Sequence, residues 1–500
     1  MRSGGALRRD GVPPDTKRNV GIAAMPWRGS TLALAGTGQS PQLGWAALIA
    51  VSLATGIAIA FAGLNALYLG VTLVGCGLLF FDFRIGVWLL VLLFPLSRTV
   101  YFPHEMLGLK GLNPLNLLLL ATLASCLLQG GWSELRRLAP ASLLLYVVPL
   151  LGGGLIGIGH IDEIQFDRPP FQVDFHDAPG YVVEMVMKPA TLIVFALLVG
   201  IVAMRTAKPE RLLLPMIGAL CAVCLLVIGF VASTGVSLAR LAGSDAREAL
   251  GALGPHANEF GHMFAVAFAL LLFGWHGTDQ RWLKVLLGIA LVIDSTALLL
   301  TFSRSSFTGL IVVLVLYAWW NRRIRTLVAA LIVASITLLV LPDAFYDRLG
   351  SGIGDGLNAI SAGRIDYLWR PLLPEVLRNP VFGNGLSSIL WSEPMRRGAG
   401  GFVLSVSHPH SAYLEALLDV GVVGLVAICA YLLSVYKGFR QLAADPRLSP
   451  TLRGFFLGAA AGLAGLLVAD LADNSLMPRT EQVFLWFAIG MMYGARQRAR

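Results

Sequence analysis

The chain has 500 residues, of which 56% are hydrophobic and 13% are charged, and its formal net charge is +9. Soluble domains carry about 25% charged residues, so the composition excludes a soluble protein and indicates a polytopic membrane protein. Its apolar segments are continuous runs and not ten-residue alternations, which excludes a transmembrane β-barrel. All five cysteines, Cys76, Cys126, Cys221, Cys224 and Cys429, lie in apolar runs and predict packing residues without a disulfide framework.

The hydropathy pattern predicts an all-α, polytopic transmembrane helical bundle of about 12–14 spans. Residues 1–42 are basic and rich in Gly, Pro and Ser, which is typical of a disordered cytoplasmic leader. Apolar runs long enough to span a bilayer follow, the first at 43–61 and the eleventh at 326–341. We therefore expect transmembrane helices 1–11 at 43–341, a large loop at 342–410, C-terminal transmembrane helices at 411–495 and a short tail at 496–500.

The Lys and Arg residues between these runs set the expected orientation. Most of the 38 basic residues fall on one side if the N-terminus is cytoplasmic, as the positive-inside rule requires. Both termini are then cytoplasmic, and the basicity reflects topology and not a nucleic-acid partner. Segments 233–257, 303–306, 342–410 and 472–482 lie together on the outer face, where each carries unusual polar residues.

Arg304 stands in the polar tip Ser303–Ser306, between two apolar helices with almost no loop. A guanidinium at this depth suits bidentate binding of a pyrophosphate. The alternative is a snorkelling arginine that binds lipid headgroups.

Arg240 and Arg247 precede a polar cluster containing His256 and Asn258, which opens the next apolar helix. Helix N-termini attract anions, so this cluster is a second candidate for phosphate binding. The alternative is a capping cluster with Asn258 as the N-cap residue.

Two segments of the long loop have recognisable patterns. Residues 363–370, which include Arg364 and Trp369, predict an amphipathic helix lying along the membrane. The Asn- and Gly-rich segment 379–385 predicts a turn that returns the chain.

His408 and His410 flank Pro409 at the start of the next apolar helix. Imidazole transfers protons near neutral pH, so we expect a general base or a pyrophosphate contact. No Asp or Glu lies at a spacing typical of metal ligands, so we predict no metal. Asp419, about 13 Å further along the helix, is expected to orient a neighbouring helix. Asp294, near mid-membrane, is either a functional acid or the partner of a polar group on a neighbouring helix.

The order of these motifs resembles the O-antigen ligase and polymerase superfamily of bacterial inner-membrane glycosyltransferases. The resemblance covers about residues 230–440, with Ser411 in place of the usual asparagine and Asp419 in place of the usual glutamate. The corresponding motifs are Ser303-Arg304, Gly363-Arg364 with Trp369, Asn379-Pro380 with Gly383-Asn384-Gly385, His410 with Tyr413, Asp419 and Gly421, and Asn258 with Arg247 or Arg240.

This resemblance implies a GT-C-like fold and a metal-independent, cofactor-free, inverting glycosyl transfer on the periplasmic face. The donor would be a glycan on undecaprenyl pyrophosphate, in O-antigen or exopolysaccharide assembly. Arg304 and Arg247 would hold the pyrophosphate, and His410 would take the acceptor's proton. The expected substrate-binding residues are Arg240, Asn258, His256, Arg364, Trp369, His408 and Tyr413.

The motifs leave the acceptor open. It is another lipid-linked repeat in a polymerase, which the span count favours, lipid A core in a ligase, or a protein in an O-oligosaccharyltransferase. Membrane lipids and chain-length regulators or other assembly proteins are further expected partners. A transporter or flippase would require inverted repeats and charges at mid-membrane, where Asp294 is the one candidate, and a structural scaffold would leave the arginines replaceable.

Overall fold

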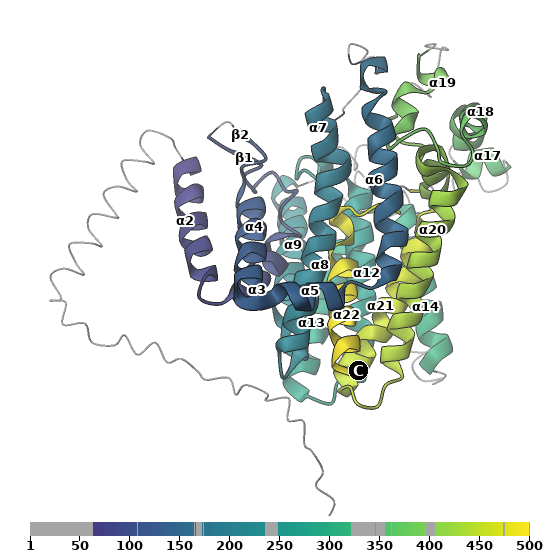
Figure 1. The fold of residues 1–500 in the computed structure, drawn as a ribbon. Helices are drawn as coiled ribbons and strands as arrows, with labels where there is room; N and C mark the ends of the chain where they lie inside the picture. Colours follow the sequence, from purple (N-terminus) through teal and green to yellow (C-terminus); the bar gives the residue numbers. More distant parts are fainter. Residues whose placement is uncertain are drawn as a thin grey trace, which may run out of the picture. The chain divides into compact units, whose positions relative to one another are not determined.

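The computed structural model describes residues 64–107, 109–164, 166, 173, 175–235, 249–321, 346, 356–361, 363–396, 406–473 and 476–499 (Figure 1). The helices of the first half are α2 (Leu64–Leu79), α3 (Phe83–Leu93), α4 (Pro114–Cys126), α5 (Trp132–Leu138), α6 (Leu144–Ile158), α7 (Ala178–Val182), α8 (Lys188–Arg205) and α9 (Leu213–Thr234). Those of the second half are α12 (Ala257–Gly277), α13 (Arg281–Leu300), α14 (Arg304–Asn321), α17 (Leu357–Ile360), α18 (Arg370–Arg378), α19 (Glu393–Arg396), α20 (Ala412–Ala443), α21 (Pro450–Ala469) and α22 (Val483–Ala499). Among these residues the strands are β1 (Glu105–Met106) and β2 (Leu109–Lys110), which pair antiparallel.

Many of the helices have the length and composition of membrane spans. Eight helical segments of the described residues are long and apolar enough to cross a bilayer: Pro114–Leu138, Ala141–Ile158, Ala178–Arg205, Pro209–Thr234, Ala257–Gly277, Arg281–Leu300, Ala412–Ala443 and Pro450–Ala469. Large apolar side chains such as Leu128 and Leu155 are exposed on them, as contact with lipid requires. The prediction of an all-α polytopic helical bundle is confirmed. The leader 1–42 and the expected spans 43–61 and 326–341 lie outside the described residues.

Helices α12, α14 and α21 approach one another closely through small residues. A Cβ atom added to Gly458 of α21 would collide with the carbonyl oxygen of Ala269 in α12. Gly309 of α14 and Gly465 of α21 face each other in the same manner. Small residues are the usual means of close helix packing in membranes, where dispersion replaces the hydrophobic effect. This packing fixes the three helices relative to one another.

The long helix α20 breaks at Gly421, whose φ of 67° lies in the left-handed region. The break frees backbone groups of α20, and the segment after α18 pairs with them. The amides of Asn384 and Gly385 donate to the carbonyls of Leu418 and Asp419, at 2.8 and 2.9 Å. These bonds hold the predicted turn at 379–385 against the upper part of α20.

Two amides of α20 just after the break donate hydrogen bonds in the opposite direction, from the helix to the loop segment. The amides of Val422 and Val423 donate to the carbonyls of Pro380 and Val381, at 2.8 and 3.1 Å. A bilayer offers no hydrogen-bond partners to backbone groups, so a break in a spanning helix needs such compensation. The loop segment and the broken helix therefore form one unit.

Replacing Gly421 by Ala should destabilise the protein markedly. A non-glycine residue with the φ of 67° and ψ of −173° found here costs about 1–3 kcal/mol, and the new Cβ would also collide with the carbonyl oxygen of Val381. Thermal unfolding of the detergent-solubilised protein measures the loss. Gly229→Ala in α9 is the matched control, because nothing lies within 4 Å of its Cβ position; equal melting temperatures for the two variants would contradict the account.

Candidate functional site

The tip at 303–306 is held by a network of side-chain hydroxyls. The Ser303 hydroxyl donates to Oδ1 of Asn258 at 2.9 Å, and the Ser306 hydroxyl donates to Oγ of Ser303 at 2.9 Å. Asn258 lies in the first turn of α12, and Arg304 is the first residue of α14. Arg304, which is half-buried, is thus placed at the same end of the bundle as the start of α12.

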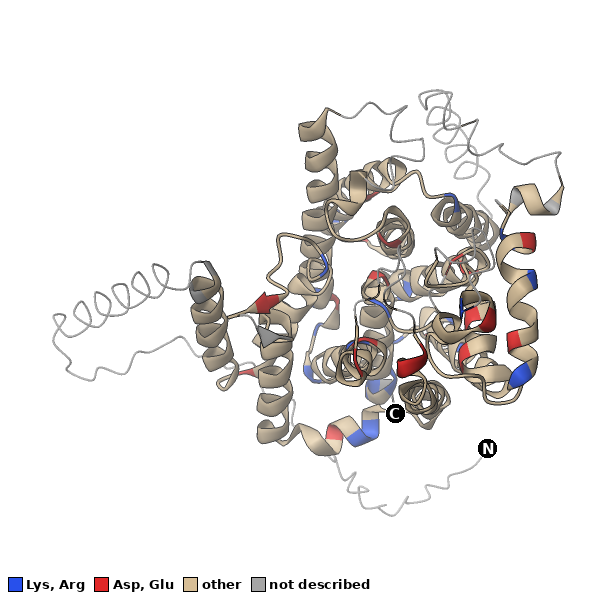
Figure 2. Cartoon of the chain, turned by 90° about the horizontal axis from the view of Figure 1, so that it is seen from above, with Lys and Arg blue, Asp and Glu red and all other residues tan. Residues whose placement is uncertain are grey.

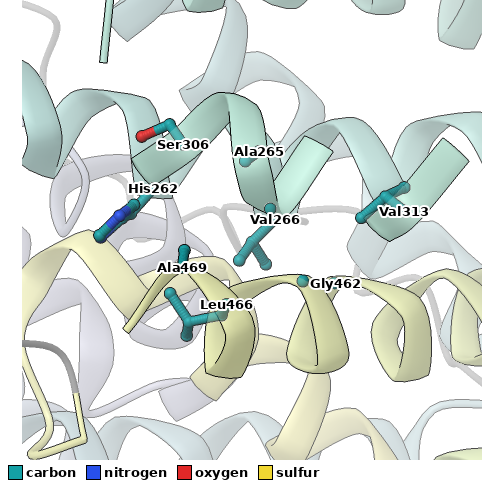
Figure 3. A pocket seen from close by; sticks show the side chains of 10 residues that line it. His262, Ala265, Val266, Ser306, Val313, Gly462, Leu466 and Ala469 are labelled. Carbon is teal, nitrogen blue, oxygen red and sulfur yellow. The ribbon is translucent and has the colours of Figure 1, made fainter. Parts of the chain in front are cut away.

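Beneath this tip lies a buried polar cluster of Ser305, His262 and Asp473. The Ser305 hydroxyl contacts Oδ2 of Asp473 at 3.2 Å and Nε2 of His262 at 3.1 Å. The imidazole and the carboxylate are 3.6 Å apart. Figure 3 shows His262 beside Ser306 and Ala469, where α12, α14 and α21 meet. Buried polar groups need such partners, so the cluster fixes how α14 begins.

The turn 470–473, which follows α21, joins three of the predicted motifs. Its Asp473 accepts the Ser305 hydroxyl next to Arg304. The guanidinium of Arg364 donates to the carbonyl of Ala472 at 2.8 Å. The amide of Ala412, two residues after His410, donates to the carbonyl of Asp470 at 3.0 Å. The segments that carry Arg304, Arg364 and His410 therefore meet at one turn.

His408 and His410 contact each other directly. Nε2 of His408 lies 3.1 Å from Nδ1 of His410, and the ring centroids are 4.1 Å apart. The indole of Trp369 donates to the carbonyl of Pro409 between them, at 2.9 Å. His410 has a φ of 51°, which is uncommon for a residue other than Gly. The strained backbone and the indole bond fix the two rings in position.

The surroundings of His408 hold its imidazole in the neutral form. Burial lowers the pKa of His408 well below its usual value of 6.5, and the neighbouring His410, Arg479, Arg364 and His256 lower it further. These residues come from four separate segments of the chain.

The start of α12 differs in one respect from the expectation. His256 is the N-cap residue: its ring accepts from the amide of Asn258 at 3.3 Å, and Glu259 accepts from the amide of His256 at 2.9 Å. The alternative that placed Asn258 at the N-cap was wrong, because α12 begins at Ala257 and Asn258 lies inside its first turn, where its side chain accepts from Ser303. The upstream Arg240 and Arg247 lie outside the described residues.

Five charged residues that were not among the predicted site residues form ion pairs at this end. Arg98 lies 2.8 Å from Glu259 and 3.9 Å from Glu481, and Arg479 lies 3.3 Å from Glu415. Viewed from above, acidic and basic segments stand close together among uncharged helices (Figure 2). The sequence contains a weak signal for one of these five residues. Arg98 lies beside an apolar run, on the face that the charge pattern predicts to be the outer one.

Glu481 is nearly inaccessible and titrates abnormally. Burial and the negative charge of Glu259 raise its pKa from 4.5 to about 7, although Arg479 and Arg98 act in the opposite direction. Burial also acts on Arg479, but Glu415, Glu481 and Glu259 outweigh it and raise the pKa of the guanidinium. Arg479 therefore stays charged beside a carboxyl group whose pKa lies near neutral pH.

Asp419 fixes the turn after the Gly-Asn-Gly segment. Its Oδ1 accepts from the amide and hydroxyl of Ser388 at 2.9 and 2.8 Å, and its Oδ2 accepts from the amide of Ser387 at 3.0 Å. Asp419 was expected to orient a neighbouring helix, and it instead holds the loop segment against its own helix.

Two further polar residues lie within spanning helices. The hydroxyl of Tyr413 donates to the carbonyl of Leu467 at 2.7 Å, which ties α20 to α21. The carboxylate of Asp294 lies 3.8 Å from Sγ of Cys224, a polar group on a neighbouring helix as expected. Cys224 is thus more than a packing residue.

These observations define a polytopic, α-helical integral membrane protein with a polar, arginine- and histidine-containing site where several helices end. Residues 289–429 match the family model described as O-antigen ligase, and this match confirms the resemblance to the O-antigen ligase and polymerase superfamily. The matched segment includes Arg304, Arg364, Trp369 and His410. The family implies a glycosyltransferase-like membrane enzyme that acts on lipid-linked glycans. No curated protein matches the chain.

Replacing Asp419 by Ala should lower stability more than replacing it by Asn. Alanine leaves three donors on Ser387 and Ser388 without their acceptor, and each buried unsatisfied group costs about 1–3 kcal/mol. Asparagine keeps one acceptor oxygen. Thermal unfolding followed by tryptophan fluorescence gives the ranking. Asp366→Ala, in an exposed pair with Arg370, is the control; a loss no larger than in that control would contradict the role.

The raised pKa of Glu481 predicts a pH-dependent stability. Between pH 4.5 and about 7 the folded protein holds a proton that the unfolded chain releases, so stability falls as pH rises through this window. Glu481→Gln should remove this fall, which amounts to at most about 3 kcal/mol. Melting temperatures from pH 4.5 to 8 test this, with Asp366→Asn in an exposed ion pair as control. Parallel curves for wild type and Glu481→Gln would refute it.

Proposed function

We propose that this protein transfers a glycan from undecaprenyl pyrophosphate to a sugar hydroxyl, on the periplasmic face of the bacterial inner membrane, with both termini in the cytoplasm. The observation that carries the proposal is the meeting of three motifs at the turn 470–473. Through it the segments of Arg304, Arg364 and His410 lie at one end of the spanning helices. A lipid-linked pyrophosphate and its sugar would meet such a site at the bilayer surface.

In the proposed reaction the arginines bind the leaving group. Arg304 and Arg247 contact the pyrophosphate and stabilise the negative charge that develops as the bond to the sugar breaks. Electrostatic stabilisation of this kind is usually the largest contribution to catalysis. A guanidinium suits the task because it stays charged and forms two parallel hydrogen bonds to phosphate oxygens.

The histidine pair provides the base. His408 is neutral, so its Nε2 can accept a hydrogen bond from the Nδ1–H group of His410 across their 3.1 Å contact. His410 then carries a basic lone pair on Nε2, which would take the proton from the acceptor hydroxyl. His408 acts here by fixing the tautomer of His410.

The proposed reaction needs neither a metal nor a nucleotide. The acceptor oxygen attacks the anomeric carbon, the bond from that carbon to the pyrophosphate oxygen breaks with inversion, and undecaprenyl pyrophosphate leaves. The hydroxyl proton moves to His410. Around the reacting atoms we place Arg240, His256, Asn258, Arg364, Trp369 and Tyr413 as substrate-binding residues, with the last four positioned by the bonds described above.

Substitution of Arg304 and His410 tests the proposal. In a strain that lacks the native gene, Arg304→Ala should reduce glycan transfer about 100-fold or more, and Arg304→Lys should restore little, because Lys cannot form the fork. His410→Ala should abolish transfer at neutral pH. Arg447→Ala, at an exposed ion pair in the loop between α20 and α21, is the control. Unchanged glycan in both Arg304 variants would rule out the enzyme.

The same strain identifies the acceptor. We favour polymerisation, in which the growing chain is joined to another lipid-linked repeat, so deletion should accumulate single repeat units on the lipid. Accumulation of long lipid-linked chains would instead indicate a lipid A-core ligase or a protein O-oligosaccharyltransferase. A chain-length regulator is the expected partner of a polymerase.

A further inference from the structure

Helix α18 and the turn after it expose apolar side chains that no other described segment covers. Leu377 is 74% exposed and Phe382 is 67% exposed, and Leu373 and Val381 are also exposed. The opposite face of the same helix is buried, with Leu372 fully inaccessible. We call Leu373, Leu377, Val381 and Phe382 the apolar ridge.

The ridge is continuous with the exposed apolar surface of a spanning helix. Val422 and Val423 of α20, whose amides bond to Pro380 and Val381, have exposed side chains, as does Val426 one turn further on. Figure 1 shows α18 beside the upper part of α20. Exposed apolar residues on a spanning helix face lipid, so the ridge lies where the lipid-facing surface of α20 ends.

Charges near the ridge are compensated within the protein. Arg370 pairs with Asp366 at 3.0 Å, and Arg378 pairs with both Glu375 and Glu393 at 2.9 and 2.8 Å. Paired arginines contribute little attraction to anionic headgroups. Apolar burial is therefore the interaction that this segment offers a partner.

We propose that the apolar ridge inserts into the bilayer at the boundary of headgroups and acyl chains, so that α18 is a membrane-surface anchor. The partner is bilayer lipid, and naming its leaflet as the periplasmic one rests on the proposed function. The same helical unit carries Trp369, in the turn Ile365–Trp369 that leads into α18, and its indole bonds to Pro409. Insertion of the ridge therefore sets the depth of His408 and His410 relative to the bilayer surface.

Site-directed spin labelling of the full chain tests the anchor. Nitroxides are attached at Leu377→Cys and Phe382→Cys in a variant whose five native cysteines are replaced by Ala. The protein is reconstituted in vesicles of phosphatidylethanolamine and phosphatidylglycerol. Power saturation then compares collision with oxygen, which partitions into lipid, with collision with a water-soluble nickel chelate. We expect oxygen-to-nickel ratios several-fold above that of an aqueous control and close to that of a lipid-facing control.

The two controls come from the same protein. Val426→Cys on α20 is the lipid-facing reference, and its signal also shows that the cysteine-free protein has folded and inserted. Asp162→Cys in an exposed loop is the aqueous reference. Nickel accessibility at 377 and 382 equal to that at 162 would overturn the proposal. Shielding of both labels from both reagents would also overturn it, because a protein and not lipid would cover the ridge. No outcome depends on glycan transfer, so failure here is distinct from failure of the proposed enzyme.

Discussion

The site depends on the hydrogen bonds that compensate one break in a membrane helix. At Gly421 the hydrogen-bond ladder of α20 stops, and its freed carbonyls and amides pair with the segment 380–385. Unpaired backbone groups at membrane depth would be costly, so these hydrogen bonds hold the segment 380–385 in one position against α20. Helix α18, which precedes this segment, is held in place with it. Trp369, immediately before α18, donates a hydrogen bond to the carbonyl of Pro409. A backbone requirement inside the membrane thereby positions the histidine pair.

Charge compensation is the second constraint on this end of the bundle. Burying a carboxylate or guanidinium is costly unless an opposite charge lies close by. Arg98 and Arg479 stand against Glu259, Glu415 and Glu481, and the protonation of Glu481 removes part of the remaining negative charge. The balance lets several ionised groups persist beside apolar helices. In the proposed function, the pyrophosphate of the donor would meet charges whose positions are already fixed.

Local patterns were sufficient to predict the elements but not the partners. Apolar runs predicted the helices, and the composition of 379–385 predicted its turn, because both depend on neighbours in sequence. His256 is the N-cap residue of α12, and the side chain of Asn258 instead pairs with Ser303, which lies 45 residues away. Arg98 and Glu259 are 161 positions apart, and no spacing rule relates them. Such contacts arise from how the helices pack, which periodicity alone does not specify.

The ion pair between Arg98 and Glu259 bears on how far this architecture is modular. Both residues lie outside the segment 289–429 that matches the family, as do Asp473 and Arg479. Grafting that segment into an unrelated helical scaffold would leave Ser305 without its carboxylate and Glu415 without its guanidinium. The segment that matches the family is thus a fragment of the working structure, and its boundaries are not those of an independently transferable unit.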